Sequence, residues 1–199
     1  MGDSQKSATA LSASRSPRER VVYQAVQHLR RHGPTGSSLR AIVRDAGAPW
    51  GSLRHYFPEG KDQILGEALH WAGVHAADGV ADYVDANADP TPGGLFLHVI
   101  DGWIEQLQRY EFSRGCPLAA ATLDHPEEGS TVATANRASL DRWERAVGVA
   151  LSQMAVADPH RLARVMLSAV EGAIILSRIT TSVEPLTDIR LLAPTFDRW

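Results

Sequence analysis

Apolar residues recur three and four positions apart along most of this chain, which is the spacing of helices that bury one face. The pattern is especially clear just after Ser38. The hydroxyl of Ser38 can accept a hydrogen bond from a free backbone N–H and so begin a helix, and Gly47 can supply the left-handed turn that ends it. The buried face of this short helix would consist of Leu39, Ile42, Val43 and Ala46.

A second short helix is predicted directly after that turn. Pro49 suits its first position, where a missing N–H costs nothing, and Pro58 disfavours helix at Phe57. Leu53 and Phe57 lie about one turn apart, so both face inward. The residues that turn outward or to the flanks are Trp50, Ser52, Arg54 and His55.

A third helix is predicted upstream of these two. The segment Ser16-Pro17-Arg18-Glu19 has the form of a capping box with proline at the first helical position, and Gly33-Pro34 should stop the helix. Three short helices that share a small core and present the last one outward form a helix-turn-helix unit, which is typical of DNA-binding proteins. The buried stripe of the first helix would be Val22, Ala25, Val26 and Leu29.

The chain after residue 61 also reads as helices, and no run of residues alternates convincingly enough for a strand. The fold class is therefore predicted to be all-α. A long helix should run from Lys61 to about Val84. Further helices should begin after the caps Thr91, Ser130 and Asp158, because each of these residues can accept from a free N–H. Breaks are expected at 114–117 and near 125–126.

Two of these later helices carry specific expectations about burial. The helix after Ser130 should face inward with Val132, Leu140, Trp143, Val147 and Leu151. A last short helix should open at Glu184-Pro185, with an inner face made of Leu186, Ile189, Leu192 and Phe196.

The residues of the N-terminal unit carry a family resemblance. The runs S-L-R-x-I-V from Ser38, A-G-A from Ala46 and G-S-L-x-H-Y-F-P-x-G-K from Gly51 resemble the DNA-binding domain of TetR-family transcriptional regulators. Gly60-Lys61 after the proline is similar to the LmrA/YxaF-like subgroup. The resemblance covers roughly residues 17 to 70, and implies a homodimeric regulator that binds a palindromic DNA operator and responds to a small-molecule effector.

The resemblance also implies which residues contact DNA. The outward helix would read the major groove, and Lys61 at the start of the next helix would contact phosphate. Trp50 and Arg54 depart from the residues that the family commonly has at these positions, and Arg54 could contact phosphate or read a guanine edge. The predicted DNA-binding residues are Ser38, Arg40, Pro49, Trp50, Ser52, Arg54, His55, Tyr56 and Lys61.

Charge supports a nucleic-acid partner for the N-terminal part. Residues 1–61 contain ten Lys or Arg and four Asp or Glu, whereas the rest of the chain contains ten and nineteen, so the chain as a whole has a net charge of −3. Such asymmetry is typical of a segment that meets phosphates, although single arginines can also serve only to solvate a helix face. The predicted organisation is a disordered arm at 1–16, a DNA-binding domain at 17–62 and a helical effector-binding and dimerisation domain at 63–199.

The helix after Asp158 is apolar or small almost all round its middle, so it should be buried on two sides. One side would face its own core and the other a second copy, as the resemblance also implies; a fully buried central helix in a monomer is the alternative. The predicted dimer interface consists of Ala169, Gly172, Ala173, Ile175, Ile179, Leu186 and Ile189.

An apolar effector pocket is predicted within the larger domain. A few polar groups would orient the ligand there. Glu171 is costly to bury alone, so it should pair with Arg178, with the second copy or with a cationic ligand. The predicted lining consists of Phe96, Trp103, Leu107, Tyr110, Cys116, Leu118, Trp143, Met166, Val170, Glu171 and Ile174.

Motifs for other functions are weak. No phosphate-binding loop, nucleophile elbow or H-E-x-x-H zinc motif occurs, and His70 and His75 are five apart and do not share a helix face, so we expect neither a cofactor nor a metal. No apolar run suits a signal peptide or a membrane span, and the single Cys116 fits a reducing cytoplasm. Three classes remain: an effector-released repressor, a ligand-independent DNA-binding regulator, and a helical enzyme or carrier with a vestigial DNA-binding domain.

Overall fold

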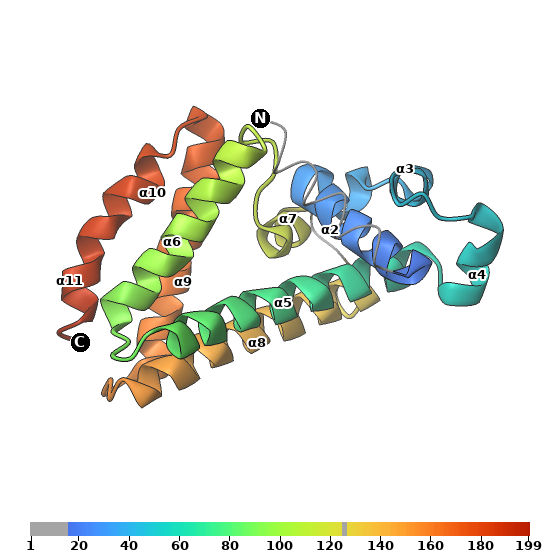
Figure 1. Cartoon of the computed structure of the whole chain (residues 1–199). Helices are drawn as coiled ribbons and strands as arrows, with labels where there is room; N and C mark the ends of the chain where they lie inside the picture. The colour runs from blue at the N-terminus through green and yellow to red at the C-terminus, as the bar shows by residue number, and fades with distance from the viewer. Residues whose placement is uncertain (1–15, 125–126) are drawn as a thin grey trace.

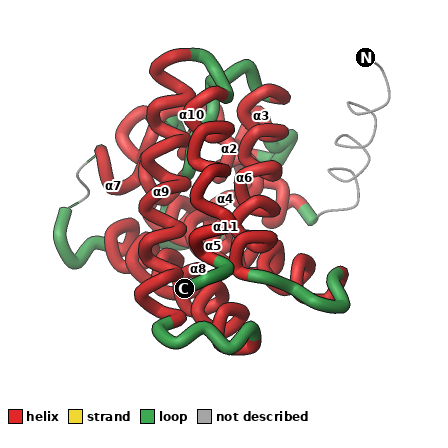
Figure 2. The backbone as a smooth tube through the Cα atoms, turned by 90° about the vertical axis from the view of Figure 1, so that its left-hand side faces the viewer, coloured by secondary structure: helices red, strands yellow, loops and turns green. Residues whose placement is uncertain are grey.

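The computed structural model describes residues 16–124 and 127–199, and this part of the chain is built from helices without a strand (Figure 2). The prediction of an all-α fold is confirmed. The predicted disordered arm, except for Ser16, lies outside the described residues. The helices are α2 (Pro17–Gly36), α3 (Leu39–Asp45), α4 (Leu53–Tyr56), α5 (Lys61–Ala86), α6 (Pro92–Arg109), α7 (Pro117–Leu123), α8 (Thr131–Gln153), α9 (Pro159–Thr180), α10 (Glu184–Asp188) and α11 (Ala193–Phe196), with 3-10 turns at Trp50–Ser52 and Ile189–Leu192.

The molecule is elongated, with α3 and α4 at one end and α9, α10 and α11 at the other (Figure 1). Helices α5 and α8 run side by side along its length and connect the two ends. Small residues let them approach closely, since a Cβ on Gly73 would lie only 2.8 Å from the Cβ of Ser139. The Ser139 hydroxyl donates a hydrogen bond of 2.8 Å to the Leu69 carbonyl, which fixes the two helices to each other.

Two main hydrophobic cores are present, and α5 contributes to both. The core at the N-terminal end joins α2, α3 and α4 to the first turns of α5, where Ile64 and Leu69 are fully buried. It also includes Ala121 of α7 and Val132 of α8. Val80, near the other end of α5, belongs to the core of the body together with α6, α8 and α9. A displacement of α5 would therefore disturb both cores.

Most predicted helix boundaries are confirmed because local hydrogen bonds set them. Ser16 and Glu19 form the expected capping box, and Gly47 has a φ of 57° at the end of α3. Side chains accept hydrogen bonds from backbone N–H groups at each of the other predicted caps, Ser38, Thr91, Ser130 and Asp158.

The end of α2 differs from the prediction. Gly33 has a φ of 65° and interrupts the helix as expected, but Pro34 starts a further turn that continues to Gly36. The carboxylate of Asp124 accepts a hydrogen bond from the Thr35 N–H and so caps this extra turn. Asp124 is distant in the sequence, so nothing near Gly33 indicated the cap.

Two further expectations about the body are wrong. Leu140 is 44% exposed, whereas the adjacent Ser139 is 3% exposed, because the close contact with α5 requires a small residue at the buried position of α8. The predicted last helix is divided into α10, a 3-10 turn and α11, and Leu192 within that turn is 38% exposed.

Candidate DNA-binding element and ligand cavity

The predicted reading helix is shorter than expected. Pro49 has an extended conformation (φ −67°, ψ 126°) and precedes a 3-10 turn at Trp50–Ser52, after which α4 makes one α-helical turn. The prediction of a continuous helix from Pro49 is therefore wrong. Leu53 and Phe57 are buried and anchor this element, as predicted.

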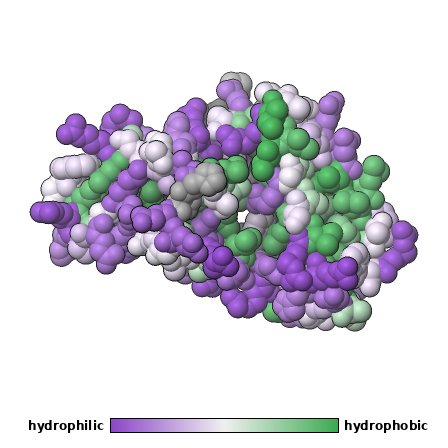
Figure 3. Space-filling model, turned by 180° about the vertical axis from the view of Figure 1, so that it is seen from behind, coloured by the Kyte–Doolittle hydropathy of each residue, from purple (hydrophilic) through white to green (hydrophobic). Residues whose placement is uncertain are grey.

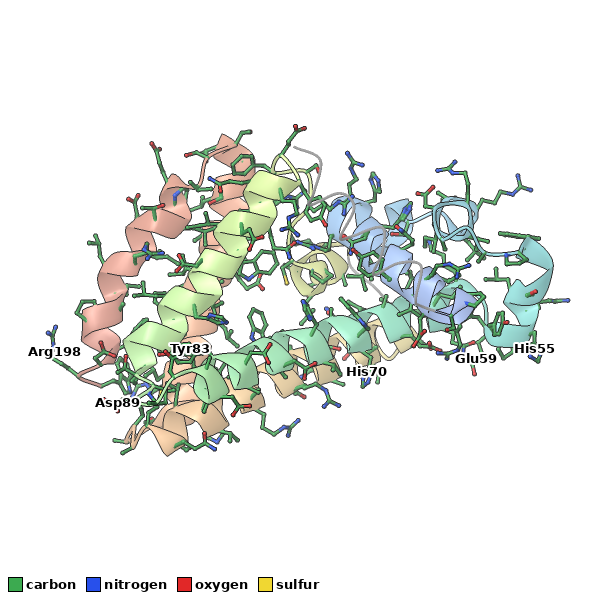
Figure 4. The ribbon with its side chains drawn as sticks, in the orientation of Figure 1. His55, Glu59, His70, Tyr83, Asp89 and Arg198 are labelled. Carbon is green, nitrogen blue, oxygen red and sulfur yellow. The ribbon has the colours of Figure 1, made fainter. Side chains whose placement is uncertain are left out.

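The residues predicted to contact DNA gather at the end of the molecule formed by α3, α4 and the start of α5 (Figure 1). The Trp50 side chain is 55% exposed, and His55 lies at the outer tip of α4 (Figure 4). Lys61 is half-buried at the first position of α5. Of the remaining predicted residues, Ser38, Arg40, Pro49 and Arg54 are exposed, and Ser52 and Tyr56 are half-buried.

Part of the N-terminal positive charge is structural. Arg18 pairs with Glu67 of α5 at 2.7 Å, and Arg20 donates from Nε to the Ala46 carbonyl at 2.9 Å. Both arginines fasten α2 to neighbouring helices. The exposed cations near α3 and α4 are therefore the ones that remain accessible to a phosphate backbone, and they include Arg40 and Arg54.

A cavity of about 220 Å³ lies between α5 and α6, and we call it the α5–α6 cavity. His75 and His98 are exposed at its mouth, whereas Arg30 and Cys116 are buried at its inner end. The lining residues come from α2 (Val26, Arg30), α5 (Trp71, Ala72, His75, Ala76, Gly79, Val80), α6 (His98, Val99, Gly102, Trp103, Gln106), the start of α7 (Cys116, Pro117, Leu118) and α8 (Trp143).

Only four of the predicted pocket residues line this cavity: Trp103, Cys116, Leu118 and Trp143. Tyr110 lies nearby and stacks against Arg114, with the guanidinium carbon 3.9 Å from the ring centroid. The other apolar candidates are fully buried in the core of the body, because α9 packs on α8 and α6 and not along the cavity. The prediction is therefore wrong for Phe96, Leu107, Met166, Val170 and Ile174.

Glu171 is also absent from the lining residues, and its expected ion pair with Arg178 does not form within the described chain. Arg178 instead donates from Nε to the Phe112 carbonyl at 3.2 Å. Burial raises the pKa of Glu171, although a hydrogen bond with Cys116 opposes the shift. Burial and the adjacent Glu171 carboxyl raise the pKa of Cys116 well above its usual value, so its thiol stays protonated.

Sequence reasoning missed Arg30 as a cavity residue. Its Nε donates to the Gly115 carbonyl and its NH1 to the Gln106 side chain, both at 3.0 Å, while the Gly115 N–H donates back to the Arg30 carbonyl at 2.9 Å. Burial lowers the pKa of this guanidinium. The available signal was its place beside the apolar stripe of α2, four residues after Val26.

Of the predicted interface residues, the structure places Ala173 and Leu186 in the protomer's own core, with 3% and 0% of their surface exposed, so they cannot face a second copy. Ile175 and Ile179 are 40% and 73% exposed. Gly172, which precedes them on α9, is also exposed. Ala169 and Ile189 are half-buried. Three exposed leucines that the prediction omitted are Leu176, Leu191 and Leu192.

Exposed apolar side chains therefore concentrate at the end of the molecule opposite the DNA-binding element. In Figure 3 apolar residues cover much of the end that carries the C-terminal helices, whereas the opposite end is mainly hydrophilic. Within the described residues, no helix combines the length and the apolar character that a membrane span requires.

Comparison with known proteins matches residues 92–191 to the family described as "Transcriptional regulator LmrA/YxaF-like, C-terminal domain". An uncharacterised HTH-type transcriptional regulator of Mycobacterium tuberculosis is 34% identical over 183 residues, which cover 85% of this chain and 88% of that protein. This chain belongs to the LmrA/YxaF-like branch of the TetR family. The HTH-type regulator LmrA of Bacillus subtilis is 25% identical, with 89% of this chain and 94% of that protein covered.

Solved structures of TetR-family proteins share the fold. A regulatory protein TetR from Rhodobacter sphaeroides superposes with a TM-score of 0.77 at 20% identity, covering 89% of this chain and 97% of that one. A TetR transcriptional regulator from Legionella pneumophila gives 0.76 at 17% identity, covering 91% and 97%. The predicted family and subgroup are confirmed, and the chain is a helix-turn-helix transcriptional regulator.

Proposed function

We propose that this TetR-family regulator is a repressor that binds a palindromic operator as a homodimer and is released by a small amphipathic effector. The observation that carries this proposal is the shared helix α5. Lys61 opens it beside the exposed residues of α4, and further along the same helix Trp71, His75 and Val80 line the α5–α6 cavity. A ligand that tilts α5 would change the position of the DNA-binding element.

The exposed stripe on α9 supports the homodimer. Gly172, Ile175 and Ile179 succeed one another at helical spacing, and Leu176 widens the stripe. Apart from Gly172 itself, its two chain neighbours and the backbone of its own helix, no described atom lies within 4 Å of a Cβ built on Gly172, so a helix from a second copy can approach closely there. Two-fold symmetry would then place two α4 helices on the two halves of a palindrome.

Release by the effector requires that it bind the DNA-incompetent state more tightly than the competent one. By reciprocity, operator DNA must weaken effector binding by the same factor. A coupling of about 1–3 kcal/mol is ordinary for such linked sites. The route through α5 is mechanically direct, because both hydrophobic cores contain residues of this helix.

Selection of bound duplexes from a random pool would test the proposal. The full chain should enrich a palindrome whose half-sites are about one helical turn apart or slightly more, with affinity that falls steeply as salt rises. A reporter under the selected operator should be silenced by the protein and restored by the effector. Failure to enrich any palindrome, or a flat salt response, would contradict operator binding by a dimer.

Two alternatives give different results in the same experiment. A ligand-independent regulator would bind the operator, and would stay bound to it in the presence of any compound that occupies the α5–α6 cavity. A helical enzyme or carrier would bind small molecules without enriching a palindrome. The proposed regulator needs no cofactor or metal and acts where the genome is, so we place it in the cytoplasm.

A further inference from the structure

The α5–α6 cavity contains a buried cation, Arg30, that forms no ion pair with a carboxylate of the described residues. Arg30 is only 8% exposed, and its hydrogen-bond acceptors are the neutral Gly115 carbonyl and Gln106 amide oxygens. Among the described residues that line the cavity, none is Asp or Glu.

Burial lowers the pKa of Arg30 and the nearby Arg114 acts in the same direction, whereas Tyr110 opposes the shift. Its guanidinium carbon lies 5.6 Å from the centroid of the Trp103 ring and 5.7 Å from that of Tyr110, so aromatic faces attract the charge. Buried charges in proteins are ordinarily paired, however, and Arg30 has no carboxylate partner among the described residues.

The other polar groups of the cavity also suit an anion. Gln106 holds the Arg30 guanidinium in place and can present its amide to a ligand, and His75 and His98 supply ring N–H groups at the mouth. The Glu171 carboxyl hydrogen bonds with Cys116, but it does not line the cavity and is not among the groups that shift the pKa of Arg30. The cavity therefore has potential hydrogen-bond donors at both ends and a positive charge, on Arg30, at its inner end.

The walls of the cavity are aromatic. Trp71, Trp103 and Trp143 line it, and His75 stacks on Trp71 with ring centroids 5.0 Å apart and an interplanar angle of 22°. Its volume of about 220 Å³ exceeds the roughly 150 Å³ of an apolar protein cavity that holds benzene. A planar body of about two fused rings would occupy this space.

We propose that the ligand of this cavity is an aromatic carboxylate of about two fused rings whose carboxylate binds Arg30. This inference rests on the proposed effector function and assigns the effector its chemical class. Because Arg30 belongs to α2, the ligand contacts the DNA-binding unit directly as well as α5. A carboxylate at the guanidinium competes with Gly115 and Gln106 for its N–H groups, and so loosens the tie between α2 and the body.

Calorimetric titration of the full chain, without DNA, tests the ligand class. The probes are naphthalene-2-carboxylate and its neutral isostere naphthalene-2-carboxamide. We expect the acid to bind at least about tenfold more tightly than the amide, because only the acid brings a negative charge that pairs with the Arg30 guanidinium in bidentate hydrogen bonds. If the amide binds equally well, or if neither probe binds, the inference is overturned.

Three variants locate the preference. Arg30→Gln should remove the advantage of the acid over the amide, and Arg30→Lys should keep part of it. The exposed neighbour Arg31→Gln has the same change in net charge and should behave like the wild type. An acid preference that survives in Arg30→Gln would assign the anion to another site. If Arg30→Gln does not fold, the inference is still tested by the relative affinities of the acid and the amide for the wild type and for Arg30→Lys.

Operator release, measured separately, distinguishes the two proposals. An acid that binds through Arg30 without releasing the operator would support the ligand class and contradict effector-controlled repression. A neutral compound that releases the operator, in a protein that shows no preference for acids, would support effector-controlled repression and contradict the ligand class. An acid that both binds through Arg30 and releases the operator would support both proposals.

Discussion

The end of the molecule that carries α4 and the end that carries α9 and α10 expose different chemistry. At the first, exposed side chains include Arg40, Arg54 and His55, which water and a phosphate backbone can satisfy. At the second, Ile179 is 73% and Leu191 is 82% exposed, and neither water nor DNA favours such a surface. We therefore expect the first end to meet DNA directly, and the second end to be covered by another protein surface, as in the proposed dimer.

This contrast teaches that DNA affinity can be lost without touching the DNA-binding end. In the proposed dimer both α4 helices would bind the palindrome at once, which would double the contacts that one copy makes. Perturbing the apolar end should therefore have the largest effect on operator affinity, although it lies at the opposite end of the molecule (Figure 1).

The largest effect is expected for Gly172→Arg. The new side chain has free space in the single protomer, so the fold should survive, but it would place an unpaired charge between two packed helices, which typically costs several kcal/mol. Analytical ultracentrifugation should show a monomer, and operator affinity should fall by roughly 100-fold or more. Leu123→Arg, at a residue of α7 that is 67% exposed, is the control and should stay dimeric. A dimeric Gly172→Arg variant would move the interface elsewhere.

The next largest effect is a loss of stability, which should differ between a core residue and a cavity residue of the body. Phe96 is 1% exposed and packs edge to face on Phe196, with centroids 4.8 Å apart, so Phe96→Ala should lower the free energy of unfolding by about 3–5 kcal/mol. Trp103 is half-buried and borders the cavity, so Trp103→Ala should cost less stability and mainly weaken ligand binding. Urea unfolding and calorimetry measure the two effects. Equal losses of stability would place Trp103 in the core.

The two regions also differ in how far the sequence predicted them. At the DNA-binding end, the decisive signals lie within a few residues: the capping box at Ser16, the left-handed Gly47 and the helix-breaking Pro58. The helices there were correctly predicted, apart from the 3-10 turn after Pro49 and the extra turn after Gly33. These boundaries depend on hydrogen bonds between residues only a few positions apart in the sequence, such as Ser16 and Glu19.

The cavity depends on contacts between residues that are far apart in the sequence. Periodicity shows that Phe96 and Met166 face inward, but it cannot show whether an inward face meets a core or a cavity. Arg30 reaches the cavity only because the loop before α7 folds back onto α2 and places Gly115 beside it. For the same reason, the buried position on α8 proved to be Ser139, where a close approach to Gly73 excludes a larger side chain.

At the DNA-binding end itself, Arg54→Ala should have a moderate effect. If Arg54 reads a base edge, the loss should be about 1–3 kcal/mol and confined to one operator position. Lys61→Ala is the contrast: it should weaken binding to all sequences alike and lower the salt slope by roughly one unit. Titrations of operator variants at several salt concentrations measure both. A uniform loss for Arg54→Ala would place this residue on phosphate, and Arg161→Ala on α9 should change neither quantity.

The smallest effect concerns a carboxyl group of the body. The Oε2 atom of Glu171 is buried and has no hydrogen-bond partner within the described chain, and burial raises the pKa of this carboxyl above its ordinary value of 4.5. The folded state therefore binds the proton of this carboxyl more tightly than the unfolded state does. The contribution of this group to the free energy of unfolding is complete below pH 4.5 and is lost as the pH rises through the pKa of the folded state. Glu171→Gln keeps the shape without the charge, and should increase the free energy of unfolding at pH 8 by about 1 kcal/mol.

Urea unfolding at a series of pH values tests this last prediction. The advantage of Glu171→Gln over the wild type should shrink as pH falls and vanish below about pH 4, where both side chains are neutral. The exposed Glu128→Gln provides a matched control and should show no such trend. A variant less stable than the wild type at pH 8 would mean that the ionised carboxylate stabilises the fold, which requires a cation beside it.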